Sequence, residues 1–524
     1  MISPRIEELF SMKFPLMERV FDTSTGRVIS MHRLTNKAAT LYEKLRYLVD
    51  YKEEAAIRRS AIQRILRRAI ILEKKSDVGL VLLRELVGAG YLPNNAVPES
   101  EGLIIQAYVD AFLVAFPVVK TTAVLKEQGI ETSLFGMLAA EIEGYLFPQH
   151  LQNAIVDALF DTVKERIAWV GSVNEHDTSR MLYVACRKSL LKSDNESLLY
   201  ALWMRDVVGA VPGALDVSKI QALNDSAVGI FVSLRMLVGH RLVPVLVHKV
   251  KNDAIAFRII HKLIADHINQ DGLALVEQGE LEQYARAFLA SKYVTENAKV
   301  LRASLRAVLY ILVTKMLLAL ALEVPYSYFV TNHINYVPLA VNVIFHPLVL
   351  LAMTRSISPL GEVNTRRIIG RLMAIVYGGE VDTIHVRFRK TSGRLGILFG
   401  AMYAVIMAIT FGGIVAGLNA LQFNIASIAL FLFFLALISY FGLRIRHNAQ
   451  GWKFIVEDDK VLPLFWGAFT LPVVRVGYWL SEKFAAINLF VFIFDIIVEA
   501  PFKLILKTTE AFIAFLKEKR EELY

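Results

Sequence analysis

Cysteine is almost absent from this chain: Cys186 is the only one among 524 residues. A single cysteine excludes a disulfide within the chain and a zinc site built from several thiolates. An isolated cysteine is usually a small buried apolar residue. We therefore expect Cys186 to lie in a core rather than to act as a reactive thiol.

Motifs of the common enzyme classes are also missing. The chain has no P-loop, no HExxH pair, no GxSxG elbow and no Rossmann glycine pattern. His261, Asp266 and His267 fall on one expected helix, but their spacing does not bring all three side chains to one ion. We expect no metal and no cofactor, and a membrane enzyme ranks third among the functions considered.

The start of the sequence lacks the features of a secretory signal. Arg5, Glu7 and Glu8 stand where a signal peptide needs an apolar run. Alternating strand patterns are scarce up to residue 300, whereas helical spacing of apolar residues recurs between glycine and proline breaks. We predict that residues 1–300 form an α-helical domain that stays in the cytoplasm.

Two long apolar runs without charge dominate the second half. Residues 395–418 and 425–443 hold 24 and 19 residues without Asp, Glu, Lys or Arg. About 20 such residues cross a hydrocarbon core roughly 30 Å thick as a helix. Residues 307–322, interrupted only by Lys315, and 336–354 form a weaker second pair. The sequence predicts two transmembrane hairpins.

The distribution of basic residues predicts the orientation of these hairpins. Residues 355–394 hold eight Lys or Arg against three acids, and residues 444–460 hold four against three. The turns 324–335 and 419–424 hold no Lys or Arg. Basic loops face the cytoplasm, so we predict a multi-pass protein of the inner membrane with a cytoplasmic N-terminus.

The predicted fold is all-α, a cytoplasmic helical domain followed by a polytopic α-helical membrane domain. Its segments are 1–300, the hairpin 301–354, the basic loop 355–394, the hairpin 395–443 and the C-terminal region 444–524. Residues 461–474 contain Pro463 and Pro472 and are expected to be too short and broken for a normal span. A re-entrant or interfacial segment is expected there, followed by an amphipathic C-terminal helix.

A small β ribbon is the one exception to the helical prediction. Ile384, Val386 and Phe388 alternate with His385, Arg387 and Arg389, which is typical of a strand. Because a lone strand is unstable, we predict that it pairs with residues 452–457. Residues 151–169 are expected to form one continuous helix.

Clusters of arginine are candidate contacts for anionic lipid or phosphate. One cluster lies on an expected helix over residues 40–72 and the other in the basic loop; they are Arg58, Arg64, Arg67, Arg68, Arg366, Arg367 and Arg371. The alternative for the first cluster is a solvated helix face. Aromatic residues that would stack on bases are absent between its arginines, which argues against nucleic acid.

Polar residues inside the expected spans form the second candidate site. Lys315 falls near the middle of the bilayer, where a charge requires a partner or a water-filled cavity. Asn342 and His346 lie one turn apart on the next expected helix and are the candidate partners. The three residues either line an ion or proton route or bond one helix to another.

Glycine pairs mark a third candidate surface. Gly396 and Gly400, and then Gly413 and Gly417, are spaced four residues apart in the third expected span. Such pairs allow helices to approach closely, either within the chain or in a homo-oligomer.

These features favour a membrane-anchored scaffold or interaction protein, with a protein partner for residues 1–300 and a bilayer of anionic headgroups around the spans. The alternative is a channel or transporter that uses Lys315, Asn342 and His346. A polar path through the spans would favour transport, whereas a sealed bundle in which these residues face each other would favour the scaffold.

Overall fold

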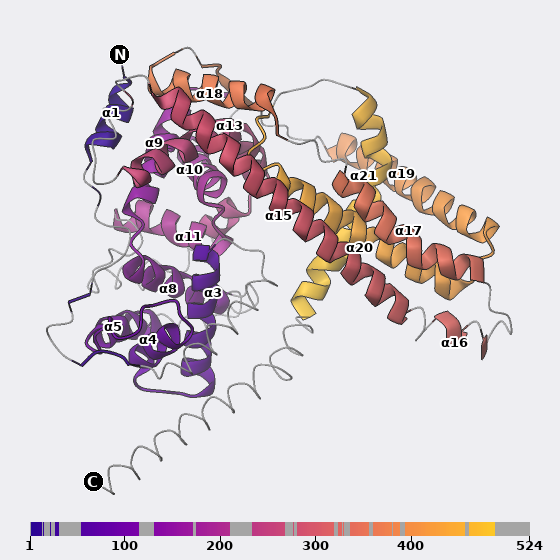
Figure 1. Cartoon of the computed structure of the whole chain (residues 1–524), viewed down its shortest axis with the longest axis horizontal. Helices are drawn as coiled ribbons and strands as arrows, with labels where there is room; N and C mark the ends of the chain where they lie inside the picture. Colours follow the sequence, from indigo (N-terminus) through magenta and orange to yellow (C-terminus); the bar gives the residue numbers. More distant parts are fainter. Residues whose placement is uncertain are drawn as a thin grey trace, which may run out of the picture. The chain divides into compact units, whose positions relative to one another are not determined.

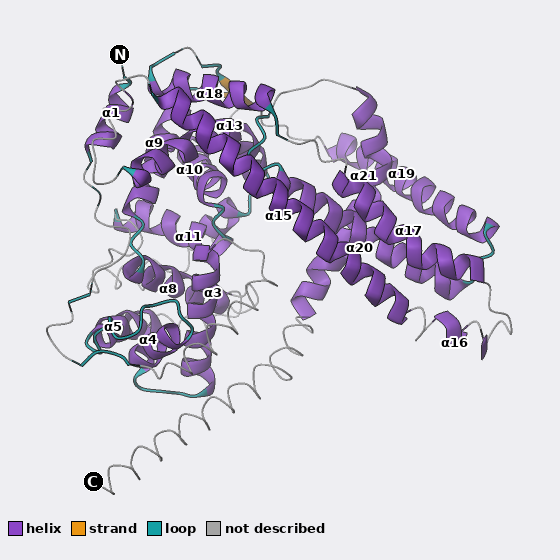
Figure 2. Ribbon diagram, in the orientation of Figure 1, coloured by secondary structure: helices purple, strands orange, loops and turns teal. Residues whose placement is uncertain are grey.

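The structure is a computed structural model, and it describes residues 2–12, 14, 21–22, 27–30, 54–114, 130–170, 174–209, 233–267, 276, 280–318, 323–326, 328–329, 336–355, 360–379, 381–387, 393–455 and 461–487. It is mostly helical, with one short two-stranded sheet, as predicted (Figure 1, Figure 2). The chain forms two compact units. Unit 1 comprises Met1–Glu280, Arg371–Phe388 and Pro501–Tyr524, and unit 2 comprises Leu281–Gly370 and Arg389–Ala500.

Unit 1 is built from helices around an apolar core. Its helices are α1 (Pro4–Ser11), α3 (Glu54–Arg67), α4 (Val78–Gly88), α5 (Glu101–Val114), α8 (Ile130–Leu146), α9 (His150–Lys164), α10 (Glu175–Leu191), α11 (Asn195–Trp203) and α13 (Leu242–Asp266), with π-helical turns at Arg68–Leu72 and Met204–Val208. Asp194 begins α11, because its Oδ1 accepts a hydrogen bond from Ser197 N at 2.8 Å. Cys186 on α10 is fully buried, which confirms its expected place in a core.

The two strands lie far apart in the sequence. β1 (Ile167–Val170) pairs in parallel with β2 (Ile384–Arg387), and Ile167 stands opposite Ile384. The strand predicted around residues 384–388 is therefore confirmed over β2, with Ile384 and Val386 buried and His385 and Arg387 exposed. The continuous helix expected over 151–169 is wrong, since α9 ends at Lys164 and β-branched and aromatic residues then form β1.

The predicted partner of β2, residues 452–457, is wrong as far as the structure describes it. Trp452 lies in a turn and residues 453–455 are in no strand, while 456 and 457 fall outside the described residues. The backbone of this segment forms hydrogen bonds with the side chain of Asn364 instead of with a strand. Its Nδ2 donates to Trp452 O at 2.9 Å, and its Oδ1 accepts from Phe454 N at 2.8 Å.

The second half of the basic loop belongs to unit 1. Arg371 Nε donates to Asp253 Oδ1 at 2.7 Å, and Arg166 Nη2 donates to Asp253 Oδ2 at 2.8 Å. Ser3 N donates to Val376 O at 2.7 Å. These hydrogen bonds and the pairing of β1 with β2 make residues 371–387 part of unit 1.

Unit 2 contains the apolar helices. They are α15 (Leu281–Leu318), the short α16 (Val324–Tyr326), α17 (Tyr336–Arg355), α19 (Gly393–Ala420), α20 (Ile425–Ala449) and α21 (Val461–Ile487); α18 (Glu362–Val376) begins in unit 2 and ends in unit 1. Three segments are long and apolar enough to cross a membrane, Tyr336–Arg355, Ile397–Ala420 and Ile425–His447. They coincide with three of the four predicted spans. The fourth predicted span is residues 307–322. Residues 307–318 of it form the end of α15, and 319–322 lie outside the described residues.

The expected break in residues 461–474 is wrong, because α21 runs through Pro472 as one helix. Helix α21 is not among the three candidate spans found in the described residues, and its re-entrant or interfacial place remains a prediction. Pro463 stands in the first turn, where a missing backbone N–H costs little. A Cβ added at Gly477 would lie 1.9 Å from Ala436 O of α20, so these two helices touch through their backbones. This packing stabilises α21 despite the hydrogen bond lost at Pro472. Residues 488–524, where the amphipathic helix is predicted, lie outside the described residues.

Candidate functional site

The three polar residues predicted inside the membrane meet in unit 2. Lys315 comes from α15, and Asn342 and His346 come from one face of α17. Their exposed fractions are 1%, 1% and 0%. The structure thus brings the predicted residues together and buries all of them.

The ammonium group of Lys315 has three acceptors. Nζ lies 2.5 Å from Asn342 O, 2.5 Å from Asn342 Oδ1 and 2.8 Å from His346 Nδ1. His346 Nε2 lies 3.0 Å from Phe431 O on α20. This arrangement assigns the proton of a neutral imidazole to Nε2, which donates to the carbonyl, while Nδ1 accepts from Lys315. All three N–H donors of the lysine are therefore used.

Two further residues complete the network and were missed in the sequence. Asn342 Nδ2 donates to Glu323 Oε2 at 3.0 Å, and the Ser427 hydroxyl donates to Glu323 Oε1. Glu323 and Ser427 are 3% and 1% exposed. In the sequence, Glu323 fits the charged residue that ends a predicted span. A single serine in an apolar helix does not by itself indicate a polar site. We call Lys315, Glu323, Asn342, His346 and Ser427 the intramembrane network, after the place predicted for them.

The intramembrane network connects the helices of unit 2. Phe431 and Phe434 of α20 flank the lysine, with ring centroids 5.8 and 4.9 Å from Nζ, which adds cation–π attraction. One lysine and one glutamate balance each other in formal charge. Within the part of the chain that the structure describes, no group of three His, Cys, Asp or Glu could hold a metal ion. The residues of the network form hydrogen bonds with one another between helices.

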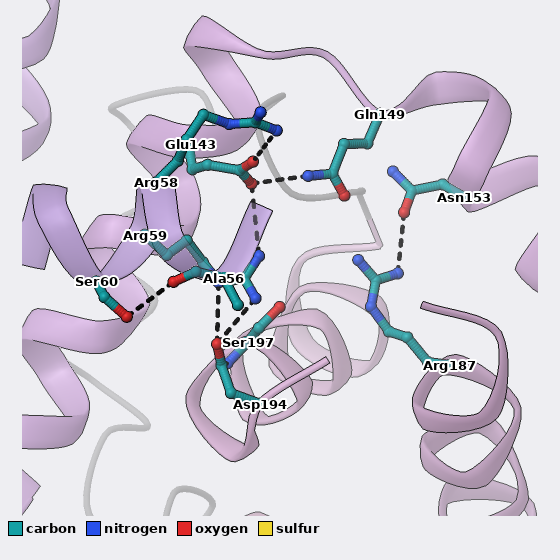
Figure 3. Close-up of polar contacts among 10 residues, drawn as sticks. All are labelled: Ala56, Arg58, Arg59, Ser60, Glu143, Gln149, Asn153, Arg187, Asp194 and Ser197. Carbon is teal, nitrogen blue, oxygen red and sulfur yellow. Dashed lines mark hydrogen bonds and ion pairs between the residues drawn. The ribbon is translucent and has the colours of Figure 1, made fainter. Parts of the chain in front are cut away.

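Arg58 of the first arginine cluster lies in a network of ion pairs in unit 1 (Figure 3). Arg58 Nη2 lies 3.1 Å from Glu143 Oε1, and Gln149 Nε2 donates to Glu143 Oε2 at 2.7 Å. Arg59, which the sequence did not single out, lies 2.8 Å from Asp194 Oδ2 and 3.7 Å from Glu143 Oε2. Burial raises the pKa of Glu143, and Arg59 and Arg58 oppose that shift.

The other candidate arginines differ in their surroundings. Arg68 pairs with Glu73 and Glu85, Arg64 is half-buried and Arg67 is exposed. In α18, Arg366 lies 3.4 Å from Glu362 and Arg367 is exposed, whereas the Arg371 guanidinium binds Asp253. Their predicted contact with lipid or phosphate remains a prediction.

Three of the four predicted glycines make no close helix contact in unit 2. At Gly400, Gly413 and Gly417 an added Cβ would meet no atom within 4 Å, while Gly396 lies in α19 with surroundings that are not described. Gly442 and Gly477 are the close contacts: an added Cβ would lie 2.8 Å from Met353 and 1.9 Å from Ala436 O. A homo-oligomer through α19 remains a prediction.

No protein-family model, no curated protein and no solved structure matches this chain. The fold and the network define an α-helical protein with three candidate membrane-spanning helices. Its function has to be argued from its own residues.

Proposed function

We propose that the protein is a membrane-anchored scaffold, in which unit 1 binds a partner protein and unit 2 holds it at the membrane. The observation that carries this proposal is the closed intramembrane network. Lys315, Asn342 and His346 bind one another, Glu323 and the carbonyl of Phe431. Groups that satisfy each other in this way are not available to an ion or substrate.

The energetics of the network support an anchor. A charged side chain at the bilayer centre costs at least about 2.5–3.5 kcal/mol, and an unpaired one costs more. In unit 2 the ammonium is offset by three acceptors and by the carboxylate of Glu323. A conduit would have to break these bonds each time a cargo passed. A sealed bundle keeps them, and it holds α15, α17 and α20 in one arrangement.

The proposed topology has the N-terminus and both basic loops in the cytoplasm and the spans in the inner membrane. Two observations support it. The basic loops carry the excess of Lys and Arg, and residues 371–387 of the first loop are bonded into unit 1. A loop that forms part of unit 1 has to lie on the same side of the membrane as unit 1.

The partner of residues 1–300 is proposed to be a protein. Described residues of unit 1 form helices around an apolar core and offer no metal-binding group. On α5, Leu103 and Val114 are exposed among the described residues. Apolar side chains on the surface of a helical unit favour docking of another protein.

Transport is the second candidate, because Lys315, His346 and Glu323 are three titratable groups in one network. A flux assay decides between the two. The full chain is reconstituted in vesicles, and proton and monovalent-ion fluxes are compared with protein-free vesicles. The scaffold predicts equal fluxes. A flux that disappears in Lys315→Met, while Lys299→Met on the same helix keeps it, would favour the transporter.

The partner is sought with the full chain crosslinked in its own membrane and purified through a tag. The scaffold predicts one protein recovered in fixed ratio, and lost in Leu103→Gln but retained in the exposed-leucine control Leu309→Gln on α15. Recovery of only those proteins that an unrelated multi-pass protein also retains would contradict the proposal.

A further inference from the structure

One group of basic residues in unit 2 is paired with acids. Arg286 lies 2.6 Å from Glu362 and 2.9 Å from Glu282. Lys292 and Lys299 both pair with Glu296, and Arg366 pairs with Glu362. Each cation of this group has at least one acidic partner within the protein.

Among the other basic residues of unit 2, Arg306, Arg355, Arg444 and Arg446 form an unpaired group. All four are exposed, and none has an acidic partner among the residues that the structure describes. Arg302, one turn earlier on α15, is exposed as well, and its Nε donates to the carbonyl of Ala298 on its own helix at 3.2 Å. The unpaired group therefore carries four positive charges without a counter-charge from the protein.

These four arginines stand at one end of the bundle formed by α15, α17 and α20. Ile311, Leu350, Phe434 and Ile438 form a buried cluster, and Ala307 and Ile445 pack against it. Arg306 precedes Ala307, and Arg444 and Arg446 flank Ile445. A Cβ at Gly442 of α20 would touch Met353 of α17, so these two residues lie at the same height in the bundle. Arg355 is two residues beyond Met353, and Arg444 is two residues beyond Gly442. The three helices lie side by side in Figure 1. We call these four residues the arginine end.

Exposed apolar side chains continue from the arginine end along the bundle. Leu309, Leu312 and Met316 follow Arg306 on α15 at helical spacing and are exposed. Leu348 and Leu351 precede Arg355 on α17 in the same way. Each of these helices thus shows an apolar strip that ends in a guanidinium group. That is the chemistry of a phospholipid, with acyl chains along the strip and a phosphate at its end.

We propose that the arginine end binds the phosphodiester headgroups of anionic phospholipids. The inference depends on the proposed place of unit 2 in the bilayer. A guanidinium fork matches two phosphate oxygens, and the phosphates supply the counter-charges that the protein lacks at this level. Zwitterionic lipids carry an ammonium that already neutralises their phosphate, so anionic lipids bind more tightly.

Thermal unfolding of the full chain in mild detergent tests this proposal. Phosphatidylglycerol is titrated against phosphatidylcholine, and the midpoint of unfolding is followed. We expect saturable stabilisation by phosphatidylglycerol at lower concentrations than by phosphatidylcholine. Each arginine removed near the surface should weaken the binding about five-fold, so Arg444→Gln with Arg446→Gln should weaken it about 25-fold. Arg306→Gln alone should weaken it about five-fold.

Arg286→Gln is the matched control, because it removes an exposed arginine of α15 that already has acidic partners. It should leave the lipid titration unchanged. Equal stabilisation of the natural chain by both lipids would overturn the proposal, even if a variant fails to fold. Equal losses in Arg286→Gln and Arg306→Gln would also overturn it. Failure to recover a partner protein would instead contradict the scaffold and leave the lipid preference untouched.

Discussion

Around Asp253, unit 1 buries charged side chains of opposite sign together, whereas unit 2 buries a lysine mainly among neutral acceptors. In unit 1, Asp253 is fully buried and binds two guanidinium groups, those of Arg166 and Arg371. In unit 2, Lys315 binds Asn342 and His346. A neutral acceptor adds no second charge that has to be desolvated on burial. The free-energy cost of desolvating a charge is largest within lipid.

The partners also differ in their distance along the chain. Asn342 and His346 are one helical turn apart, so a local pattern selects them. Asp253 is 118 residues from Arg371, and no local pattern joins the two. Asn342 and His346 could therefore be predicted as partners of Lys315, whereas Glu323, Ser427 and the ion pairs of Asp253 could not.

Breaking the paired charges of unit 1 should have the largest effect. Asp253→Ala leaves Arg166 and Arg371 buried without a carboxylate, and we expect a loss of about 3–5 kcal/mol in the free energy of unfolding. Chemical unfolding of the full chain in detergent measures it. The control is Asp266→Ala on the same helix, where Asp266 pairs with Lys262 at the surface, and its loss should be far smaller. Equal losses of stability in the two variants would contradict the importance of the buried ion pairs of Asp253 with Arg166 and Arg371.

Removing a neutral acceptor from unit 2 should cost less. Asn342→Leu takes one acceptor from Lys315 and one donor from Glu323, while Asn342 O and His346 still bind the ammonium. We expect a loss of about 1.5–3 kcal/mol for hydrogen bonds to charged groups. Asn419→Leu, at an exposed asparagine of α19, should leave the thermal midpoint unchanged. If Asn342→Leu were as stable as the natural chain, the network would not hold unit 2 together.

Glycine substitutions sharpen the comparison between helix contacts inside unit 2. Gly477→Ala places a Cβ against Ala436 O and should destabilise unit 2 by about 1–3 kcal/mol through overpacking. Gly400→Ala adds a methyl group where nothing lies within 4 Å and should not destabilise the chain. Thermal unfolding of the two variants side by side tests the packing. A reversed order would mean that α19, and not α21, makes the close contact.

The smallest expected effect is the pH dependence from Glu143. Burial raises its pKa in the folded chain, so the folded state holds this proton more tightly than the unfolded state does. The stability from this group is present below the ordinary pKa of glutamate and is lost as the pH rises through the raised pKa. Glu143→Gln should remove this loss, which unfolding measured across that pH range would show. An unchanged slope would contradict the assignment.

Local chemistry explains which parts of the fold were predictable. Hydrophobic runs located α17, α19 and α20, and alternation located β2. The partner of β2 was not predictable, because a parallel register with Ile167 depends on how the whole of unit 1 folds. Pro472 suggested a break in α21, but the tight contact at Gly477 outweighs it. Glu323 was missed because the same residue also fits the end of a span.

The sealed state of the intramembrane network is the central claim, and Ser427→Cys tests it most directly. The substitution is nearly isosteric and keeps an S–H that can donate to Glu323. Cys186 stays in place, because its thiol is buried and burial raises its pKa. The full chain is placed in vesicles and treated on both faces with a membrane-impermeant thiol reagent. Ala420→Cys at the exposed end of α19 is the control. The account predicts that Ser427→Cys stays unlabelled while Ala420→Cys reacts completely, and labelling of both at similar rates would contradict it.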